Sequence, residues 1–217
     1  MAKNITTQIW KYISNDASIK KLLHSGLINN RALAKKAMRD LGLRTSTETI
    51  VSAIRRYDDW ENKTEETYKK ARELLKKSTF SSKSNIACIT LKKDIEIRNI
   101  LPHIFSGVDF SKGEVLRIVQ GELFVKVIVD EHNLAKIIEI IPENFIVKTT
   151  KGLAELNVIF DGEAENTPGL VSVVTNELSS NNVNMQEVLT CVPELIILVK
   201  EKDFLNGVKI LYGLIKE

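Results

Sequence analysis

"NTPGLVSVVTNELSSNNVNMQ", residues 166–186, has the clearest local pattern in the chain. Its apolar residues recur at helical spacing, so Leu170, Val174 and Leu178 share one face of a predicted helix. A polar turn follows, and a strand is expected to begin near Asn184. The segment thus predicts a loop, a helix, a turn and a strand in succession, and its loop decides whether this part of the chain can hold a small ligand.

The polar residues of the segment allow two interpretations. Pro168 suits the first turn of a helix, and Gly169 lets backbone and ligand approach without a Cβ. Asn182 tolerates the left-handed backbone needed where the chain reverses. Asn166 and Asn184 offer donors and acceptors to a zwitterion, near a helix start that favours a carboxylate. The same residues also suit a plain helix start and turn, so ligand binding and simple packing both stay open.

The order of elements occurs twice, because sliding the chain by 70 residues aligns two hydrophobic patterns without a gap. Ile100 falls on Leu170, and Val127 falls on Ile197. In the first copy we expect strands at 86–91, 114–120, 123–129 and 144–150, and helices at 97–105 and 132–141. The fold class is therefore α+β, with two ferredoxin-like βαββαβ units at 84–150 and 151–217.

The last strand of the second unit lacks an obvious counterpart in the sequence. The chain ends soon after the last predicted helix, so this strand is expected to be short, missing or supplied from elsewhere. Open sheet edges of this kind favour side-by-side pairing between the units or between two chains. We therefore expect a homodimer or a larger assembly formed by sheet pairing.

Residues 153–213 resemble the ACT domain, a small amino-acid-sensing module, through "ENTPGL" before the helix and "NVNMQ" after it. The resemblance implies that Asn166 and Asn184 contact a free amino acid, with Gly169 and Leu170 as backbone contacts. Serine-sensing members typically carry a histidine where this chain has Ala164, so serine is not implied as the ligand. An ACT-type fold used only for assembly is the alternative.

The first unit, 84–150, lacks this signature. Glu96, Arg98 and Asn99 occupy the positions of the motif's asparagine, proline and glycine. We interpret the unit as a degenerate ACT-like copy with a structural role.

Charge is unevenly distributed along the chain. Residues 1–84 hold 18 Lys and Arg against 9 Asp and Glu, whereas residues 85–217 hold 13 against 19. A net charge of +9 followed by one of −6 indicates a basic module that meets an acidic partner. A solvated helical surface rich in lysine is the plainer interpretation.

Four short helices are expected in the basic part, at 4–14, at 18–25, from Asn29 or Asn30, and from Ser46. The start of the last of these has "TSTE", where Ser or Thr followed by Glu48 resembles a capping box. The stretch "LAKKAMRDLGLRTSTETIVSAIRRY", 33–57, resembles a helix-turn-helix module with a turn about two residues longer than usual. A small helical bundle that contacts another protein is the alternative.

The helix-turn-helix resemblance implies double-stranded DNA as a partner. The start of the last helix would read DNA through Arg44, Thr45, Ser46, Thr47 and Thr49. Phosphate contacts would come from Arg31, Lys35, Arg55 and Arg56.

The complete order is a helical domain at 1–60, a connector helix and Ser-rich linker at 61–83, and the two ACT-like units. This order resembles predicted archaeal regulators of amino-acid metabolism. It implies an amino-acid-responsive, DNA-binding transcription regulator. The alternative is a regulatory subunit that docks on a biosynthetic enzyme without binding DNA.

Several functions find no support in the sequence. There is no apolar run long enough for a membrane span, so a cytoplasmic protein without a membrane partner is expected. Cys88 and Cys191 stand in apolar stretches as core thiols, and the histidines have no metal-ligand spacing. No nucleophile–base pair or phosphate-binding loop is present, so we expect neither an enzyme nor a bound cofactor.

Overall fold

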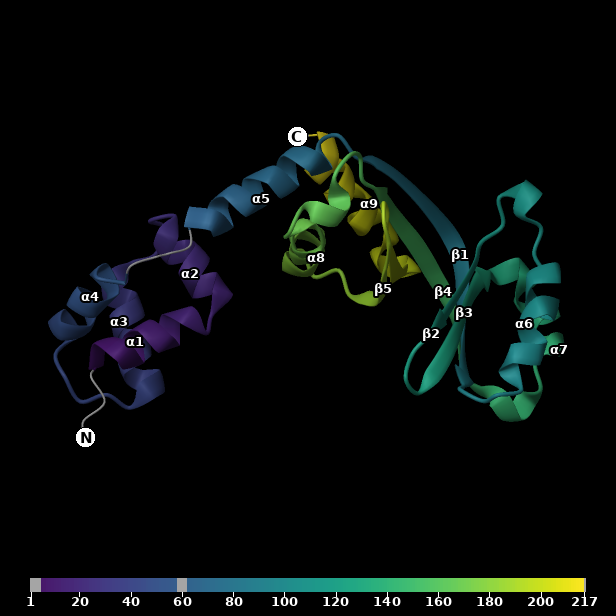
Figure 1. Cartoon of the computed structure of the whole chain (residues 1–217), viewed down its shortest axis with the longest axis horizontal. Coiled ribbons are helices and arrows are strands. Elements are labelled where there is room, and N and C mark those ends of the chain that lie inside the picture. The colour runs from purple at the N-terminus through teal and green to yellow at the C-terminus, as the bar shows by residue number, and fades with distance from the viewer. Residues whose placement is uncertain (1–4, 58–61, 217) are drawn as a thin grey trace. The chain divides into compact units, whose positions relative to one another are not determined.

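The computed structural model describes residues 5–57 and 62–216, apart from the side chains of residues 24 and 62–68. The chain forms two compact units, Met1–Lys69 and Lys70–Glu217, drawn together in Figure 1. The predicted α+β class is confirmed, since helices and one antiparallel sheet make up the described chain. No helix among these residues is both long enough and apolar enough to cross a membrane.

The N-terminal unit is built from short helices whose ends match the sequence signals closely. They are α1 (Ile5–Ser14), α2 (Ala17–His24), α3 (Asn30–Leu41) and α4 (Thr47–Arg55). Asp16, Asn29 and Ser46 cap the last three, each accepting hydrogen bonds from backbone N–H groups of the first turn. Fully buried Ile9, Ile13, Leu33, Ile50 and Ile54 form the centre of the core. Amphipathic spacing therefore accounts for this bundle.

The turn between α3 and α4 begins at Gly42, which has a left-handed φ of 63°. The Leu43 N–H donates to the Met38 carbonyl at 2.9 Å and closes the end of α3. The predicted capping box is not formed, because Ser46 is the cap and accepts from the Thr49 N–H, so Glu48 stands one position too early. The Glu48 carboxylate instead accepts a hydrogen bond from Arg31 at 2.9 Å.

The C-terminal unit contains one sheet of six strands, ordered β2-β3-β1-β4-β6-β5, with every neighbouring pair antiparallel. Its strands are β1 (Thr79–Lys92), β2 (Leu116–Gln120), β3 (Phe124–Asp130), β4 (Ile146–Ile159), β5 (Met185–Cys191) and β6 (Glu194–Lys200). Its helices are α5 (Asn62–Leu75), which enters from the N-terminal unit, α6 (Ile97–Ser106), α7 (Leu134–Ile140), α8 (Leu170–Ser180) and α9 (Glu201–Lys216). Short 3-10 turns η1 (Phe110–Lys112), η2 (Glu131–Asn133), η3 (Glu143–Phe145) and η4 (Ala164–Asn166) join some of them.

Each half of the sheet has the ferredoxin-like strand order. The first sheet half comprises β2, β3, residues 86–92 of β1 and residues 146–150 of β4. The second comprises β5, β6, residues 153–159 of β4 and residues 79–83 of β1. The missing last strand of the second unit is thus supplied by residues 79–83 at the start of β1, which precede the rest of the second half in the chain.

Two boundaries expected from the sequence fall inside continuous strands. Residues 79–83, expected within a Ser-rich linker, pair with residues 155–159 of β4. Small polar side chains suit a loop, but pairing with the open edge of β4 satisfies their backbone groups equally well. The expected boundary after residue 150 lies within β4. The long strands bend where the halves meet, at Asn85 and Gly152, whose φ angles are 57° and 64°.

Helices cover one face of the sheet, with α6 and α7 on the first half and α8 and α9 on the second (Figure 1). Where these helices meet the sheet, Ile104 of α6, Ile137 of α7 and Val127 of β3 are fully buried. On α9, Gly207 comes so close to the sheet that an added Cβ would lie 2.6 Å from Leu156 Cδ1. Alternate residues of β4, β6 and β3 therefore pack against helices, as the repeated pattern predicts.

The other face of the sheet curls onto itself. Lys126 on β3 forms an ion pair with Glu187 on β5, although a flat sheet would separate these strands by roughly 19 Å. Arg117 on β2 donates to both carboxylate oxygens of buried Glu155 on β4, at 2.9 and 2.7 Å. Hydrogen bonding to Glu155 raises the pKa of the Arg117 guanidinium. These pairs cross an apolar cluster that includes Cys88 and tie the two halves together.

The turn before β2 is organised by Glu114. Its carboxylate accepts hydrogen bonds from the Asp109 N–H at 2.8 Å, from His132 Nε2 at 3.1 Å and from Asn133 Nδ2 at 2.8 Å. These donors, the Asp109 N–H above all, lower the pKa of Glu114 from 4.5 to about 2.

Glu114→Gln is expected to flatten the pH dependence of unfolding between pH 4.5 and about pH 2. The folded-state pKa lies below the unfolded one, so the unfolded state binds more protons in this window. The stabilisation is therefore complete above pH 4.5 and is lost as the pH falls toward 2. Urea unfolding at several pH values measures it, with Glu139→Gln as an exposed control. Identical pH profiles for wild type and Glu114→Gln would contradict the assignment.

Candidate ligand site

The loop between β4 and α8 turns at Pro168 and Gly169. Gly169 has φ 91° and ψ −10°, close to the values that the third residue of a type II turn adopts. Helix α8 starts at Leu170, and its first bond runs from the Val173 N–H to the Gly169 carbonyl at 2.8 Å. Pro168 therefore lies before the helix, whereas the sequence placed it in the first helical turn. The N–H groups at this helix start favour a carboxylate ligand.

A hollow of about 340 Å³, the α8 hollow, opens beside this helix start. Its lining includes Phe160, Thr167, Leu170, Thr190, Val192 and Glu194. The Phe160 N–H donates to the Pro193 carbonyl at 2.9 Å and holds the end of β4 against the β5–β6 turn. Of the lining described, Glu194 is the one charged residue, and it accepts a hydrogen bond from Asn157 Nδ2 at 3.0 Å. A ligand here would meet hydroxyls, apolar surface, one carboxylate and the positive end of α8.

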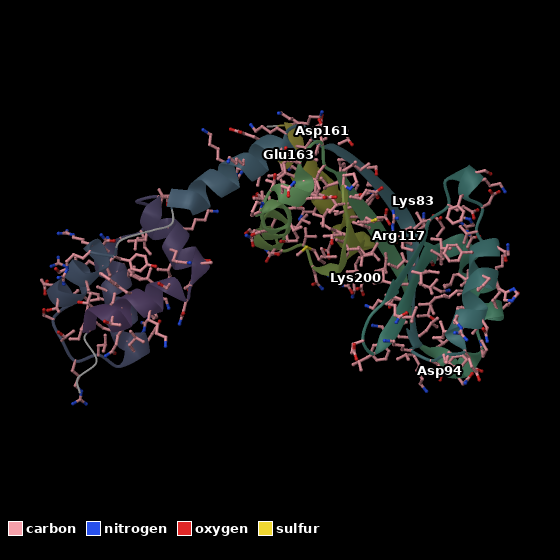
Figure 2. The ribbon with its side chains drawn as sticks, viewed as in Figure 1. Lys83, Asp94, Arg117, Asp161, Glu163 and Lys200 are labelled. Atoms are coloured by element: carbon pink, nitrogen blue, oxygen red, sulfur yellow. The ribbon has the colours of Figure 1, made fainter. Side chains whose placement is uncertain are left out.

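The structure brings Gly169 and Leu170 into the α8 hollow but not the two asparagines. Exposed Asn166 ends η4, at the end of the sheet half where β4 ends and β6 begins. Exposed Asn184 precedes β5, at the end where β6 finishes. Figure 2 labels Asp161 near the first of these ends and Lys200 at the second.

Helix α8 runs between the two asparagines and is about 16 Å long over its 11 residues. The expectation that Asn184 begins its strand beside the Asn166 loop is therefore wrong within one chain. Sequence spacing did not reveal this, because both residues flank the same helix and only the direction of that helix separates them. Asn182 does adopt the expected left-handed backbone, with φ 59°.

Strand β5, which follows Asn184, is one edge of the sheet, and β2 is the other. Glu187 is the one charged residue of β5, and its carboxylate is turned toward Lys126 on the curled face. The edge therefore lacks the charged side chains that usually prevent strand pairing.

A second hollow, of about 700 Å³, lies at the equivalent place in the first sheet half, and we name it the α6 hollow. Lining positions of the two hollows coincide at the 70-residue offset: Asp94, Ile97, Leu101, Gln120 and Glu122 correspond to Ala164, Thr167, Val171, Thr190 and Val192. Motif reading missed the α6 hollow because it carries no asparagine–glycine signature. The repeat itself was the signal that could have found it.

The predicted DNA contacts gather around α4 and the start of α3. A hollow of about 600 Å³ there is lined by Arg31, Glu48, Ser52 and Arg55, among others. Several candidates already have partners: Arg31 pairs with Glu48, Ser46 caps α4, Thr47 Oγ1 contacts Met38 Sδ and Arg56 Nε donates to the Ser52 carbonyl. Thr49 supplies the N–H for the Ser46 cap, and Thr45 is partly buried. Lys35, Arg44 and Arg55 are exposed.

Similar solved structures include aspartate kinase from Clostridium acetobutylicum, at 23% identity and a TM-score of 0.52. The match covers 63% of this chain and 34% of that one, so the chain spans about a third of the kinase's length. Aspartokinase alpha and beta subunits match at 14% identity and a TM-score of 0.50, over 64% of this chain and 97% of theirs. At these identities the likeness is one of fold. No protein-family model and no curated protein sequence matches the chain.

Gly169→Ala is expected to destabilise the C-terminal unit by about 1–2 kcal/mol, because a Cβ is strained at a left-handed φ. Gly213→Ala on α9 is the matched control, since its Cβ would meet no atom within 4 Å. That control should be neutral or stabilising by up to about 1 kcal/mol, as alanine is the better helix former. Urea unfolding measures both, and equal stability of the two variants would argue against the turn geometry.

Proposed function

We propose that this protein is an amino-acid-responsive transcription regulator, with a sensor in the ACT-like C-terminal unit and a DNA-binding N-terminal unit. The α8 hollow is the observation that carries the sensor role. In this hollow the start of α8 favours the carboxylate of a ligand, and the carboxylate of Glu194 suits the ligand's ammonium group. In this proposal the chain binds and signals and is not an enzyme, and the amino acid is its one small-molecule partner.

Pairing of two copies through β5 would complete the ligand site. Within one copy, Asn184 stands at the start of β5 and the Asn166 loop stands near its end. An antiparallel β5–β5 contact about a two-fold axis puts the start of one strand beside the end of its partner. Asn166 of one copy and Asn184 of the other would then flank the same α8 hollow. The uncharged edge of β5 supports this assembly.

The likeness to aspartate kinases supports a sensory role for the fold. The Clostridium enzyme is named as an allosteric enzyme in amino-acid production. An amino acid bound between two copies would favour one arrangement of the dimer, and α5 is the covalent link from the sheet to the basic helices.

DNA binding by the N-terminal unit is supported by its charge and by the α3–α4 pair. Residues 1–57 hold 11 Lys and Arg against 3 Asp and Glu. Exposed Lys35, Arg44 and Arg55 on α3, the turn and α4 suit phosphate contacts. Docking on an enzyme is the second candidate, favoured by exposed Leu22, Leu27 and Leu41 on the same unit.

The shared ligand site is testable by mixing variants. Asn166→Ala and Asn184→Ala homodimers should each lose the thermal stabilisation that the effective amino acid gives to the wild type. Mixed after unfolding and refolding together, they form heterodimers in which one of two sites carries both asparagines. Calorimetry should then recover one binding site per heterodimer, and fewer than one per dimer over the whole mixture, because the homodimers do not bind. No recovery on mixing would contradict a site shared between copies.

DNA binding is expected to weaken in the double variant Arg44→Gln/Arg55→Gln. Each lost phosphate contact should lower the slope of log K against log salt by about 1, because fewer counterions are released. Fluorescence anisotropy with a duplex at several salt concentrations measures this. Lys11→Gln, which removes an exposed charge on α1, is the control. Salt-insensitive binding, or an equal effect of the control, would favour the docking alternative.

A further inference from the structure

We propose that the α6 hollow is a second effector site, which takes a zwitterionic α-amino acid with a large apolar side chain. This goes beyond the proposed function, which assigns a ligand only to the α8 hollow. It also replaces the interpretation of the first unit as purely structural. The proposal rests on the position, the apolar floor and the unpaired charges of the hollow.

The position of the α6 hollow is set by the fold and is not an irregularity of the surface. It lies between the β1–α6 loop, the start of α6 and the β2–β3 turn. The α8 hollow lies between the corresponding elements of the second sheet half. A duplicated sheet with helices on one face thus leaves the same opening twice. At about 700 Å³, the α6 hollow is within the usual size range of small-molecule sites and about twice as large as its counterpart.

The floor of the hollow is apolar and belongs to the core. Ile97 and Val125 are 3% and 4% exposed, and Leu101 and Ile118 pack against the same cluster. At the rim, the apolar side chain of Leu123 is 70% exposed. The aliphatic or aromatic side chain of a ligand, packed on this floor, would remove the apolar lining residues from water.

Charges of both signs surround this floor. Lys93, Asp94, Arg98 and Glu122 line the hollow, two cations and two carboxylates. In the described part of the chain, Lys93, Arg98 and Glu122 make no ion pair or side-chain hydrogen bond, and Asp94 uses one oxygen to accept from the Glu96 N–H at 3.0 Å. Figure 2 shows Asp94 at the end of the first half, well away from Lys83 and Arg117.

Unpaired charges that sum to zero favour a ligand that carries both signs and no net charge. Arg98 can hold a carboxylate through two parallel hydrogen bonds, and Lys93 adds a further donor. Glu122 and the second oxygen of Asp94 can accept from an ammonium group. An α-amino acid presents these two groups on one carbon and directs its side chain elsewhere, which matches charges at a rim above an apolar floor.

The two hollows would therefore differ in selectivity. At the coinciding positions, Asp94 and Glu122 of the α6 hollow are replaced by Ala164 and Val192 in the α8 hollow. The α6 hollow can complement both ligand charges with side chains of one chain. The α8 hollow depends on its helix start and on Glu194, and it is smaller. We expect the larger apolar amino acids in the α6 hollow alone.

The test is calorimetric titration of the intact protein with L-leucine and L-phenylalanine. Two analogues are used beside leucine: 4-methylpentanoate, which lacks the amino group, and 3-methylbutylamine, which lacks the carboxylate. We expect one or both amino acids to bind and both analogues to bind at least tenfold more weakly. Absence of binding by both amino acids, or analogues as tight as leucine, would overturn the proposal.

Variants locate the site. Arg98→Gln and Glu122→Gln should each weaken binding at least tenfold, whereas Lys148→Gln and Glu139→Gln, exposed charges of the same sheet half, should leave it unchanged. These are surface substitutions, so an unfolding curve that matches wild type verifies the fold of each. Asn184→Ala should not affect leucine binding. Loss with Asn184→Ala but not with Arg98→Gln would support the α8 hollow and overturn the α6 site, which separates the two proposals.

Discussion

The long antiparallel pair of β1 and β4 is the constraint on which the rest of the C-terminal unit depends. Each strand contributes its two ends to different halves of the sheet. Strand β4 is the last strand of the first half and the first strand of the second, while β1 is the first strand of the first half and takes the place of the last strand in the second. Neither half has its full complement of backbone hydrogen bonds without the other. Each half separated from the other would leave backbone groups of these strands unpaired, and positive φ angles at Asn85 and Gly152 mark the place where the halves meet.

Two ion pairs join strands across the curled face of the sheet. Arg117 and Glu155 join through two hydrogen bonds over a face that would otherwise be open to water, and Glu155 is almost completely buried. A carboxylate in such a place is tolerable only with a partner of this geometry. The ion pair of Lys126 with Glu187 repeats the arrangement between β3 and β5. A ligand that displaced β5 would therefore also disturb the ion pair that β5 makes with Lys126 in the first half.

The two hollows stand at the same point of a duplicated plan but offer different chemistry. Fold sets the opening, because a strand, a helix start and a hairpin turn meet there in each half. The lining side chains differ: unpaired charges stand above an apolar floor in the α6 hollow, and hydroxyls, Glu194 and a helix start line the α8 hollow. Under the two proposals, one sheet would carry sites for two amino acids, and the free edge of β5 would be the place where two copies pair.

Local pattern was enough to predict the helices, most of the strands, the α+β class and the helix starts near Asn29 and Ser46, though not which neighbouring residue is the cap. The strand role of residues 79–83 could not be predicted, because a polar stretch becomes a strand only when a distant edge offers it hydrogen bonds. The separation of Asn166 from Asn184 likewise needed the direction of α8. Charges around the α6 hollow are scattered between residues 93 and 122 and have no motif. Their convergence is a property of the sheet, which alone brings together two loops that are remote in the chain.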